Sequence, residues 1–296
     1  VVVLKGVPLE GDLYPEPGLR PTGDLDLLVR EPDLPRAVEV VRGLGFEPRE
    51  GEGVADAYRG HHHLAPFAHR VSGVALELHR DVVAPRRPYR LELAGLWERT
   101  RERAVEGRRC LVLAPEDQLL HLCLHFLGDR LDYRHGALLQ VCDLALLLRR
   151  YGGALRWDWV VGAARRQRVA PAVYTVLYVV RWTTGAPLPP EVDAELAPEG
   201  FEERQARLFA LRRVVAEQRR YPRVAQALAA ARAVGPVGYA LRLLRRGDGG
   251  VGRRAAAPQP PAVLGGLGTL LLGVPRLGEQ VRVERFLHRC LQQGGG

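Results

Sequence analysis

The sequence lacks several residue types altogether. Its 296 residues include no Met, no Ile and no Asn, only one Lys and one Ser, and abundant Arg, Ala, Gly, Pro, Leu and Val. This bias is typical of a very GC-rich genome, so the formal charge of +9, carried by Arg over the whole length, is weak evidence for nucleic-acid binding. Aromatic residues are only 6% of the chain and are not interleaved with a compact basic patch. We therefore do not expect nucleic acid as the main partner.

Cysteine is also scarce, and long apolar runs are absent. The four cysteines include no C-x-x-C pair, which argues against a disulfide framework or a zinc knuckle and favours reduced thiols. The longest apolar run, at 262–274, is Gly-rich and too short to span a bilayer. No charged segment precedes an apolar run at the N-terminus, so a signal peptide is not expected. These absences predict a cytoplasmic protein with no membrane partner. The cysteines are Cys110, Cys123, Cys142 and Cys290.

The most informative stretch is 20–29, Arg-Pro-Thr-Gly-Asp-Leu-Asp-Leu-Leu-Val. A turn leads into a predicted strand, where alternation puts Asp24 and Asp26 on one face and turns Leu25 and Leu27 into the core. The two acidic side chains start about 6.6 Å apart, so they can converge on divalent metal, including two ions about 3.5–4 Å apart. Neighbouring acids repel each other, so folding alone does not explain the pair. A bound cation would explain it.

Two further residues fit a metal and phosphate site. Glu77 lies in Val-Ala-Leu-Glu-Leu-His, where alternation puts Glu77 and His79 on one face, as a third metal ligand or a base requires. The alternative is a solvated Glu on an open sheet face. Lys5 is the one Lys in an Arg-rich chain, and a compact ammonium suits phosphate, although one Lys could fall there by chance.

The pattern along the chain predicts an α+β fold. A small mixed-sheet domain is expected at 1–113, an all-helical C-terminal domain at 114–246, a flexible linker at 247–261 and a helical tail at 262–296. The chain begins with Val rather than Met, which fits either a GTG start codon or a truncated N-terminus. Strands are expected at 1–5, 24–30, 46–49, 55–59, 62–68 and 74–79, and helices at 7–14, from Asp33 (as N-cap) to Gly45, from 115, and at 136–150, 157–169, 172–184, 201–221 and 224–246.

Several motifs also occur in a characteristic order. They are Lys-Gly at 5–6, Leu-Tyr-Pro at 13–15, Arg20, Gly-Asp-Leu-Asp-Leu-Leu-Val at 23–29, Leu-Glu-Leu-His at 76–79, Glu-Asp-Gln-Leu-Leu-His-Leu-Cys-Leu-His at 116–125, and the helix that contains Asp143. As an ordered set over residues 1–185, they resemble the uncharacterised nucleotidyltransferase family of the DNA polymerase β-type superfamily.

The resemblance implies a nucleotidyltransferase fold in which Asp24, Asp26 and Glu77 are the catalytic, metal-binding carboxylates. It implies Mg²⁺ (with Mn²⁺ as a substitute) and an NTP, from which a nucleoside monophosphate passes to a hydroxyl by a two-metal, in-line mechanism. Lys5, Gly6 and Arg20 would contact the triphosphate and its phosphate oxygens.

One departure from the wider superfamily concerns phosphate binding. That superfamily carries Gly-Ser at the end of its first strand, whereas this chain, like the family it resembles, has Lys5-Gly6. This departure leaves one alternative open, a catalytically degenerate protein that binds a nucleotide or a partner. The Arg-rich composition leaves a second one open, an RNA-modifying or nucleic-acid-binding protein, which strongly salt-dependent affinity for RNA would support.

The remaining candidates are histidines. His61, His62 and His63 could bind metal, but in a strand adjacent residues point to opposite faces, so at most two of them would share a site. His121 and His125 lie one turn apart on a predicted buried helix, a spacing that can bind zinc. Because the H-E-x-x-H glutamate and a third ligand are missing, we expect them instead to be core histidines at the border of the cleft.

Asp143 lies in a strongly apolar helix, so a buried carboxylate there needs a partner. An Arg or His contact and a contact to the acceptor substrate are both open. His79, His125 and Asp143 are thus our candidates for substrate contacts. The acceptor could be a sugar, another small molecule, a peptide or a protein side chain, and the sequence leaves it and the oligomeric state unassigned.

Overall fold

The computed structural model describes residues 1–214 except 17, 50–57, 59, 86–88, 106, 133–136 and 212–213. The helix predicted at 224–246, the linker at 247–261 and the tail at 262–296, with Cys290, lie outside these residues. The division into domains therefore stays a prediction.

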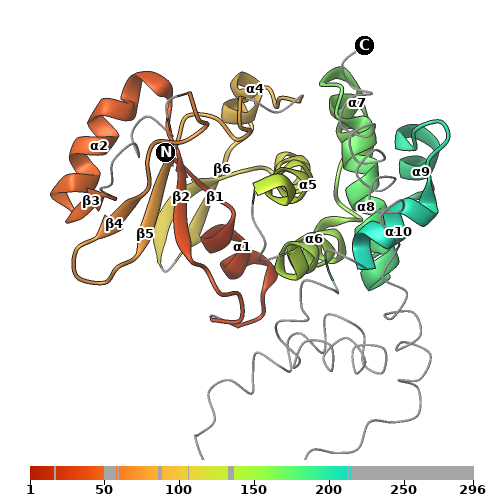
Figure 1. The fold of residues 1–296 in the computed structure, drawn as a ribbon, viewed down its shortest axis with the longest axis horizontal. Coiled ribbons are helices and arrows are strands. Elements are labelled where there is room, and N and C mark those ends of the chain that lie inside the picture. The colour runs from red at the N-terminus through yellow and green to blue at the C-terminus, as the bar shows by residue number, and fades with distance from the viewer. Residues whose placement is uncertain are drawn as a thin grey trace, which may run out of the picture.

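A seven-stranded mixed sheet forms the part of the protein coloured red to yellow in Figure 1. Its strands, in order across the sheet, are β3 (Phe46–Pro48), β4 (Phe67–His69), β5 (Ala75–His79), β2 (Asp24–Leu28), β1 (Val2–Leu4), β7 (Arg108–Val112) and β6 (Arg101–Val105). The pairs β2–β5 and β1–β7 are parallel, and the other neighbours are antiparallel. The first strand of the chain thus lies inside the sheet.

After Val112, every regular element in the described part of the chain is a helix. The helices and the one 3₁₀ turn are α1 (Gly6–Leu13), η1 (Glu31–Asp33), α2 (Leu34–Gly43), α4 (Leu93–Glu98), α5 (Pro115–Asp132), α6 (Ala137–Tyr151), α7 (Trp157–Arg166), α8 (Ala170–Thr184), α9 (Pro190–Leu196) and α10 (Glu203–Ala210). Figure 1 shows α5 and α6 between the sheet and the group α7–α10, in agreement with the contacts of α5 and α6 with α8.

Both faces of the sheet are covered. On one face, Val41 of α2 belongs to a cluster with Leu76 and Leu78, against which Leu25 and Leu27 pack. On the other face, the apolar core runs from β1 and α1 into α5, α6 and α8. The sequence placed Leu25 and Leu27 in the core, but they are only half-buried, because the helices cover the opposite face of β2 more completely. The acids of that strand therefore lie under the helices.

Most of the strand predicted at 62–68 is not a strand in the structure. The segment 62–68 is not continuous: only its end belongs to β4, and His63 forms an isolated bridge with His79. Pro66 cannot donate a ladder hydrogen bond, which disfavours a regular strand there. The segment predicted as a strand at 55–59 lies outside the described residues except for Tyr58. Asp33 precedes α2 as expected but makes no side-chain capping bond.

Sequence reasoning missed α4, α9 and the hairpin of β6 and β7. In both strands of the hairpin most residues are exposed or half-buried, and Arg101, Arg103, Arg108 and Arg109 dominate them. An edge hairpin with so little apolar alternation gives no strand signal. Gly107, with φ of 72°, forms its turn because this left-handed conformation favours glycine.

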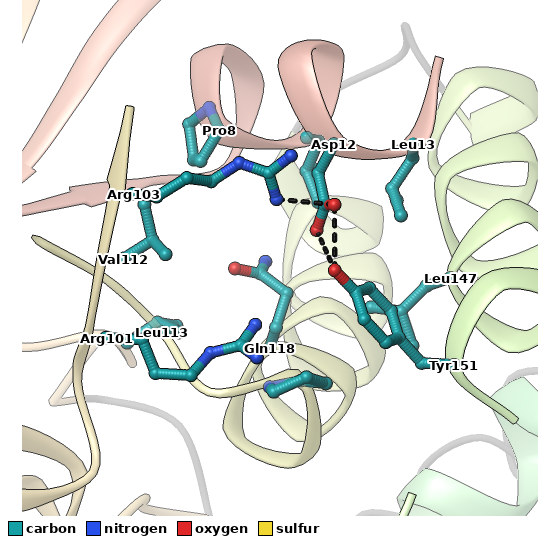
Figure 2. Close-up of a pocket in the computed structure, with 12 residues that line it drawn as sticks. Pro8, Asp12, Leu13, Arg101, Arg103, Val112, Leu113, Gln118, Leu147 and Tyr151 are labelled. Atoms are coloured by element: carbon teal, nitrogen blue, oxygen red, sulfur yellow. Dashed lines mark hydrogen bonds and ion pairs between the residues drawn. The ribbon is translucent and has the colours of Figure 1, made fainter. Parts of the chain in front are cut away.

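A hydrogen-bond network ties this hairpin to the helices. The hydroxyl of Tyr151 on α6 lies 2.7 and 2.6 Å from the two carboxylate oxygens of Asp12 on α1. Arg103 of β6 also pairs with Asp12, and the three residues line a cavity of about 20 Å³ (Figure 2). The network fixes α1 between β6 and α6, and α1 starts beside the predicted site.

Two expectations from composition can be compared with the described residues. Cys110, Cys123 and Cys142 are free thiols, and Cys123 is fully buried. Among the described helices, we find none with the length and the apolar character needed to cross a membrane.

Candidate functional site

Adjacent strands bring the three predicted carboxylates together. In the parallel pairing of β2 with β5, Asp26 stands opposite Glu77, and Asp24 stands opposite Ala75 on the same face. Nε2 of His79 lies 2.8 Å from Oδ1 of Asp26 and 3.3 Å from Oε2 of Glu77. Because carboxylates only accept, this nitrogen carries the proton. One ligand atom each from Asp26, Glu77 and His79 lies within 4.8 Å of the others, close enough to share a metal ion.

Lys5 reaches this cluster from the end of β1. Leu4 pairs with Asp26 across the sheet, and the next residue places its Nζ 3.0 Å from Oδ1 of Asp26. Lys5 has φ of 48° and ψ of −114°, a conformation that costs a non-glycine residue about 1–3 kcal/mol. Backbone strain of this kind is concentrated at functional sites, so it supports a role for Lys5 beyond packing.

Gly6 begins α1 in a place that admits no side chain. A Cβ at this position would lie 2.6 Å from Cγ2 of Thr22 and 3.2 Å from Nη1 of Arg20. The loop before β2 therefore closes directly over the first turn of α1. This close contact explains why the residue after Lys5 is glycine, because any side chain at position 6 would collide with Thr22 and Arg20.

The charges at the site depend on one another. Burial and the neighbouring Asp26 raise the pKa of Asp24, against the attraction of Lys5. Burial alone would also raise the pKa of Asp26, but Lys5 and the hydrogen bond from His79 outweigh it and hold this pKa well below its usual range. Burial likewise acts against the charged form of Glu77, whose pKa is nevertheless lowered by His79 and His63. In the absence of metal, Lys5 and His79 thus stabilise the carboxylates.

His79 is 1% exposed, and its own pKa follows from these contacts. Burial would lower the pKa of His79, but the hydrogen bonds to Asp26 and Glu77 raise it above the ordinary 6.5. A raised pKa stabilises the folded state fully below the unfolded value, and this contribution disappears as the pH rises through the folded value. In metal-free buffer we therefore expect His79→Gln to destabilise the protein most below pH 6.5, by about 1.5–3 kcal/mol, and progressively less at higher pH.

The measurement is urea unfolding of wild type and His79→Gln between pH 5 and 9. His69→Gln is a matched control, because His69 bonds to Ser72 at the end of β4 and not to the carboxylates. A difference between wild type and His79→Gln that stays constant over this range would contradict the assignment.

Arg20 is already paired on the helical side. Its Nε and Nη2 lie 2.8 Å from the two carboxylate oxygens of Asp143 on α6, and the hydroxyl of Tyr14 donates to the same carboxylate at 2.7 Å. Asp143 is 0% exposed. Of the two partners left open for Asp143, an Arg or His side chain and the acceptor substrate, the structure shows the arginine. Both carboxylate oxygens of Asp143 are bonded to Arg20, and one of them also accepts from Tyr14. Nη1 of Arg20 faces Thr22 at 3.3 Å.

A cavity of about 60 Å³ adjoins the carboxylate cluster. Lys5 and His79 line it from the sheet side, and His125 and the fully buried His121 line it from α5. The two α5 histidines thus border the site as the sequence suggested, but only His121 is a core residue, because His125 is half-buried. The other residues around the cavity are His62, Val82, Val83, Ala84, Tyr89 and Leu124.

Comparison with protein families assigns a family to more than half of the chain. Residues 1–185 match a family model described as uncharacterised nucleotidyltransferase. This chain belongs to that family. The general activity of the family is nucleotidyl transfer, and the match runs from β1 to the end of α8, so it includes every residue of the site. Neither the curated proteins nor the solved structures gave a match.

In this nucleotidyltransferase family member, sequence reasoning left three contributors out of the site. His63 approaches Glu77, with 3.6 Å between Nε2 and Oε2, and His62 lines the cavity. The run of three histidines was a visible signal, but the assumption of a strand placed neighbours on opposite faces. Tyr14, the second partner of Asp143, lay within the Leu-Tyr-Pro motif but had no assigned role.

Proposed function

We propose that the protein transfers a nucleoside monophosphate from an NTP to a hydroxyl of an acceptor, with divalent metal held by Asp24, Asp26 and Glu77. The observation that carries this proposal is the register of β2 and β5. It sets Asp26 opposite Glu77 and keeps Asp24 on the same face. A cluster of one buried and two half-buried carboxylates is costly for folding alone, and a metal–nucleotide complex explains it.

The donor set fits a hard divalent cation. Mg²⁺ prefers oxygen ligands, and a few carboxylates together with substrate phosphates are its usual partners in such sites. Three carboxylates face two cationic groups, Lys5 and His79, so the cluster keeps an excess of negative charge even with both groups protonated. Mn²⁺ accepts the same ligands.

The metal ions, when bound, would neutralise the triphosphate and stabilise the attacking and leaving oxygens. Asp24, Asp26 and Glu77 would hold them, and Glu77 would also accept the proton of the acceptor hydroxyl. Lys5 lies directly before the N-terminus of α1, where backbone amides favour phosphate, so we assign phosphate binding to Lys5 and Gly6. Arg20 would contribute through Nη1, because its other donors bind Asp143.

We place the acceptor hydroxyl in the adjoining cavity, which His79 and His125 line on opposite sides. Its chemistry favours a polar acceptor, because imidazole nitrogens can hydrogen-bond a hydroxyl.

A catalytically degenerate nucleotide-binding protein is the second candidate, and one contact favours it. Lys5 lies 3.0 Å from Oδ1 of Asp26, an oxygen that a metal ion would need. On this alternative, Lys5 replaces the metal permanently. Such a protein would bind an NTP without any turnover.

The test is thermal stability with each NTP in turn, with and without Mg²⁺, followed by pyrophosphate release with a panel of hydroxyl acceptors. A ligand at 100 times its dissociation constant should stabilise the fold by about 2.7 kcal/mol. We expect a metal-dependent shift with at least one NTP. A shift without pyrophosphate release would favour the degenerate alternative, and no shift with any NTP in folded protein would contradict both.

A further inference from the structure

Three consecutive histidine rings converge beside the carboxylates, although adjacent residues of a strand could not do so. One ligand nitrogen each from His61, His62 and His63 lies within 4.8 Å of the others. Their ring centroids are 4.3, 4.3 and 4.7 Å apart. The expectation that at most two of them share a site is therefore wrong, because the chain bends here rather than running as a strand.

The bend has a local cause. Gly60 has φ of 72°, in the left-handed region that favours glycine, and the amide of His61 donates to the carbonyl of Tyr58 at 3.0 Å. The chain thus turns directly before the first histidine. The ring of Tyr58 packs against those of His61 and His63, with centroids 5.3 and 5.1 Å away.

The segment is also anchored to the end of β5. The carbonyl of His62 accepts hydrogen bonds from the amides of Arg80 and Asp81, at 2.8 and 3.1 Å, and His63 pairs with His79. The three rings are therefore presented by a backbone that is fixed on both sides. A fixed arrangement of this kind lowers the cost of organising ligands around an ion.

The protonation of one ring is set by its neighbours. Nδ1 of His63 lies 2.7 Å from the carbonyl oxygen of Leu64, so Nδ1 donates and Nε2 keeps its lone pair. A metal-bound histidine typically makes this contact, with the second ring nitrogen bonded to a backbone carbonyl. Nδ1 of His62 is buried and has no hydrogen-bond partner among the described residues, so it is a second nitrogen that a ligand would satisfy.

We propose that His61, His62 and His63 form a binding site for a transition metal ion of the Zn²⁺ or Co²⁺ type. Imidazole suits these ions, whereas Mg²⁺ prefers oxygen. Three protein ligands leave one position of a tetrahedral ion open, which is the arrangement of sites that take water or substrate. The site borders the carboxylates at His63 and Glu77 but uses other ligands, and it does not depend on the proposed transferase activity.

The experiment is titration of the untagged full chain with Co²⁺, read by its visible absorption, and with Zn²⁺, read by equilibrium dialysis. Because the carboxylates could also take these ions, the ions are counted in Asp24→Asn/Asp26→Asn, where we expect one bound ion per chain. Adding His61→Gln/His62→Gln should weaken the binding of this ion at least about 100-fold, since changes even in residues that support metal ligands cost 10–100-fold. Adding His69→Gln instead should leave its binding unchanged, because this substitution leaves the three rings in place.

A second measurement needs no variant. X-ray absorption of the Zn²⁺-loaded wild type should show imidazole scattering with Zn–N distances of about 2.0–2.1 Å. The proposal is overturned by any of three results: an all-oxygen shell, binding of unchanged affinity when His61→Gln/His62→Gln is added to folded Asp24→Asn/Asp26→Asn, or complete loss of binding in Asp24→Asn/Asp26→Asn alone. Absence of Co²⁺ and Zn²⁺ binding by the wild type would overturn it as well.

Discussion

Asp26→Asn is expected to abolish the metal-dependent stabilisation by NTP and to lower nucleotidyl transfer by roughly 1000-fold, or about 4 kcal/mol. Asp26 is 3% exposed, pairs with both Lys5 and His79, and stands opposite Glu77 in the register of β2 and β5. An amide keeps the shape of the side chain but removes the negative charge that a metal ion needs. The measurement is pyrophosphate release, together with the thermal shift in Mg²⁺ and NTP.

The matched control is Asp33→Asn. Asp33 is exposed, makes no capping bond at α2, and undergoes the same chemical change in the same part of the fold. It should keep both the shift and the turnover. Because Asp26→Asn also leaves Lys5 and His79 without their anion, each variant is compared with its own ligand-free form. Full turnover in Asp26→Asn would contradict the assignment of the metal site.

The second large effect concerns stability. Asp143→Ala should destabilise the protein by about 3–5 kcal/mol, because it leaves the guanidinium of Arg20 buried without its partner. Arg20 is 8% exposed and makes two 2.8 Å contacts to Asp143, so water cannot replace the lost carboxylate easily. Tyr14 loses its acceptor in the same substitution. Urea unfolding at neutral pH measures the effect.

Two further variants test whether the loss of stability comes from leaving Arg20 buried without its anion or from losing a side-chain contact of any kind. Arg20→Met/Asp143→Leu removes both charges, and we expect it to recover most of the stability, since apolar replacement of a buried pair is often neutral. The exposed pair of Arg36 and Glu39 is the control, and Glu39→Ala should change stability by less than about 1 kcal/mol. A loss of similar size in Asp143→Ala and Glu39→Ala would contradict a buried, structural ion pair.

The alternation of β2 and β5 could be read from the sequence, because period two is a local property. It correctly put Asp24 with Asp26 and Glu77 with His79. The register that sets Asp26 opposite Glu77 could not be predicted from local patterns, because it depends on pairing between strands about 50 residues apart. Glu77 was assigned to the same site as Asp26 through the resemblance of the ordered motifs to the family.

Other features depended on contacts that no local pattern encodes. The partner of Asp143 was limited to an Arg, a His or the acceptor, but nothing in the sequence selected Arg20, 123 residues away. The bend at Gly60 reversed the expectation for the three histidines, since one left-handed residue is enough to change which rings meet. Most residues of the hairpin of β6 and β7 lie exposed or half-buried at the sheet edge, so neither strand carries an apolar stripe.

The position of β1 inside the sheet also has a consequence for how the chain folds during synthesis. Val2 pairs with Leu28 on one side and with Leu111 on the other, so its two neighbours are translated 26 and 109 residues later. Closing the longer loop costs more entropy, and such distant pairings slow folding. Until β7 has left the ribosome, one edge of β1 stays open to other strands. We therefore expect nascent chains from which β7 has not yet emerged to be the forms most prone to aggregate.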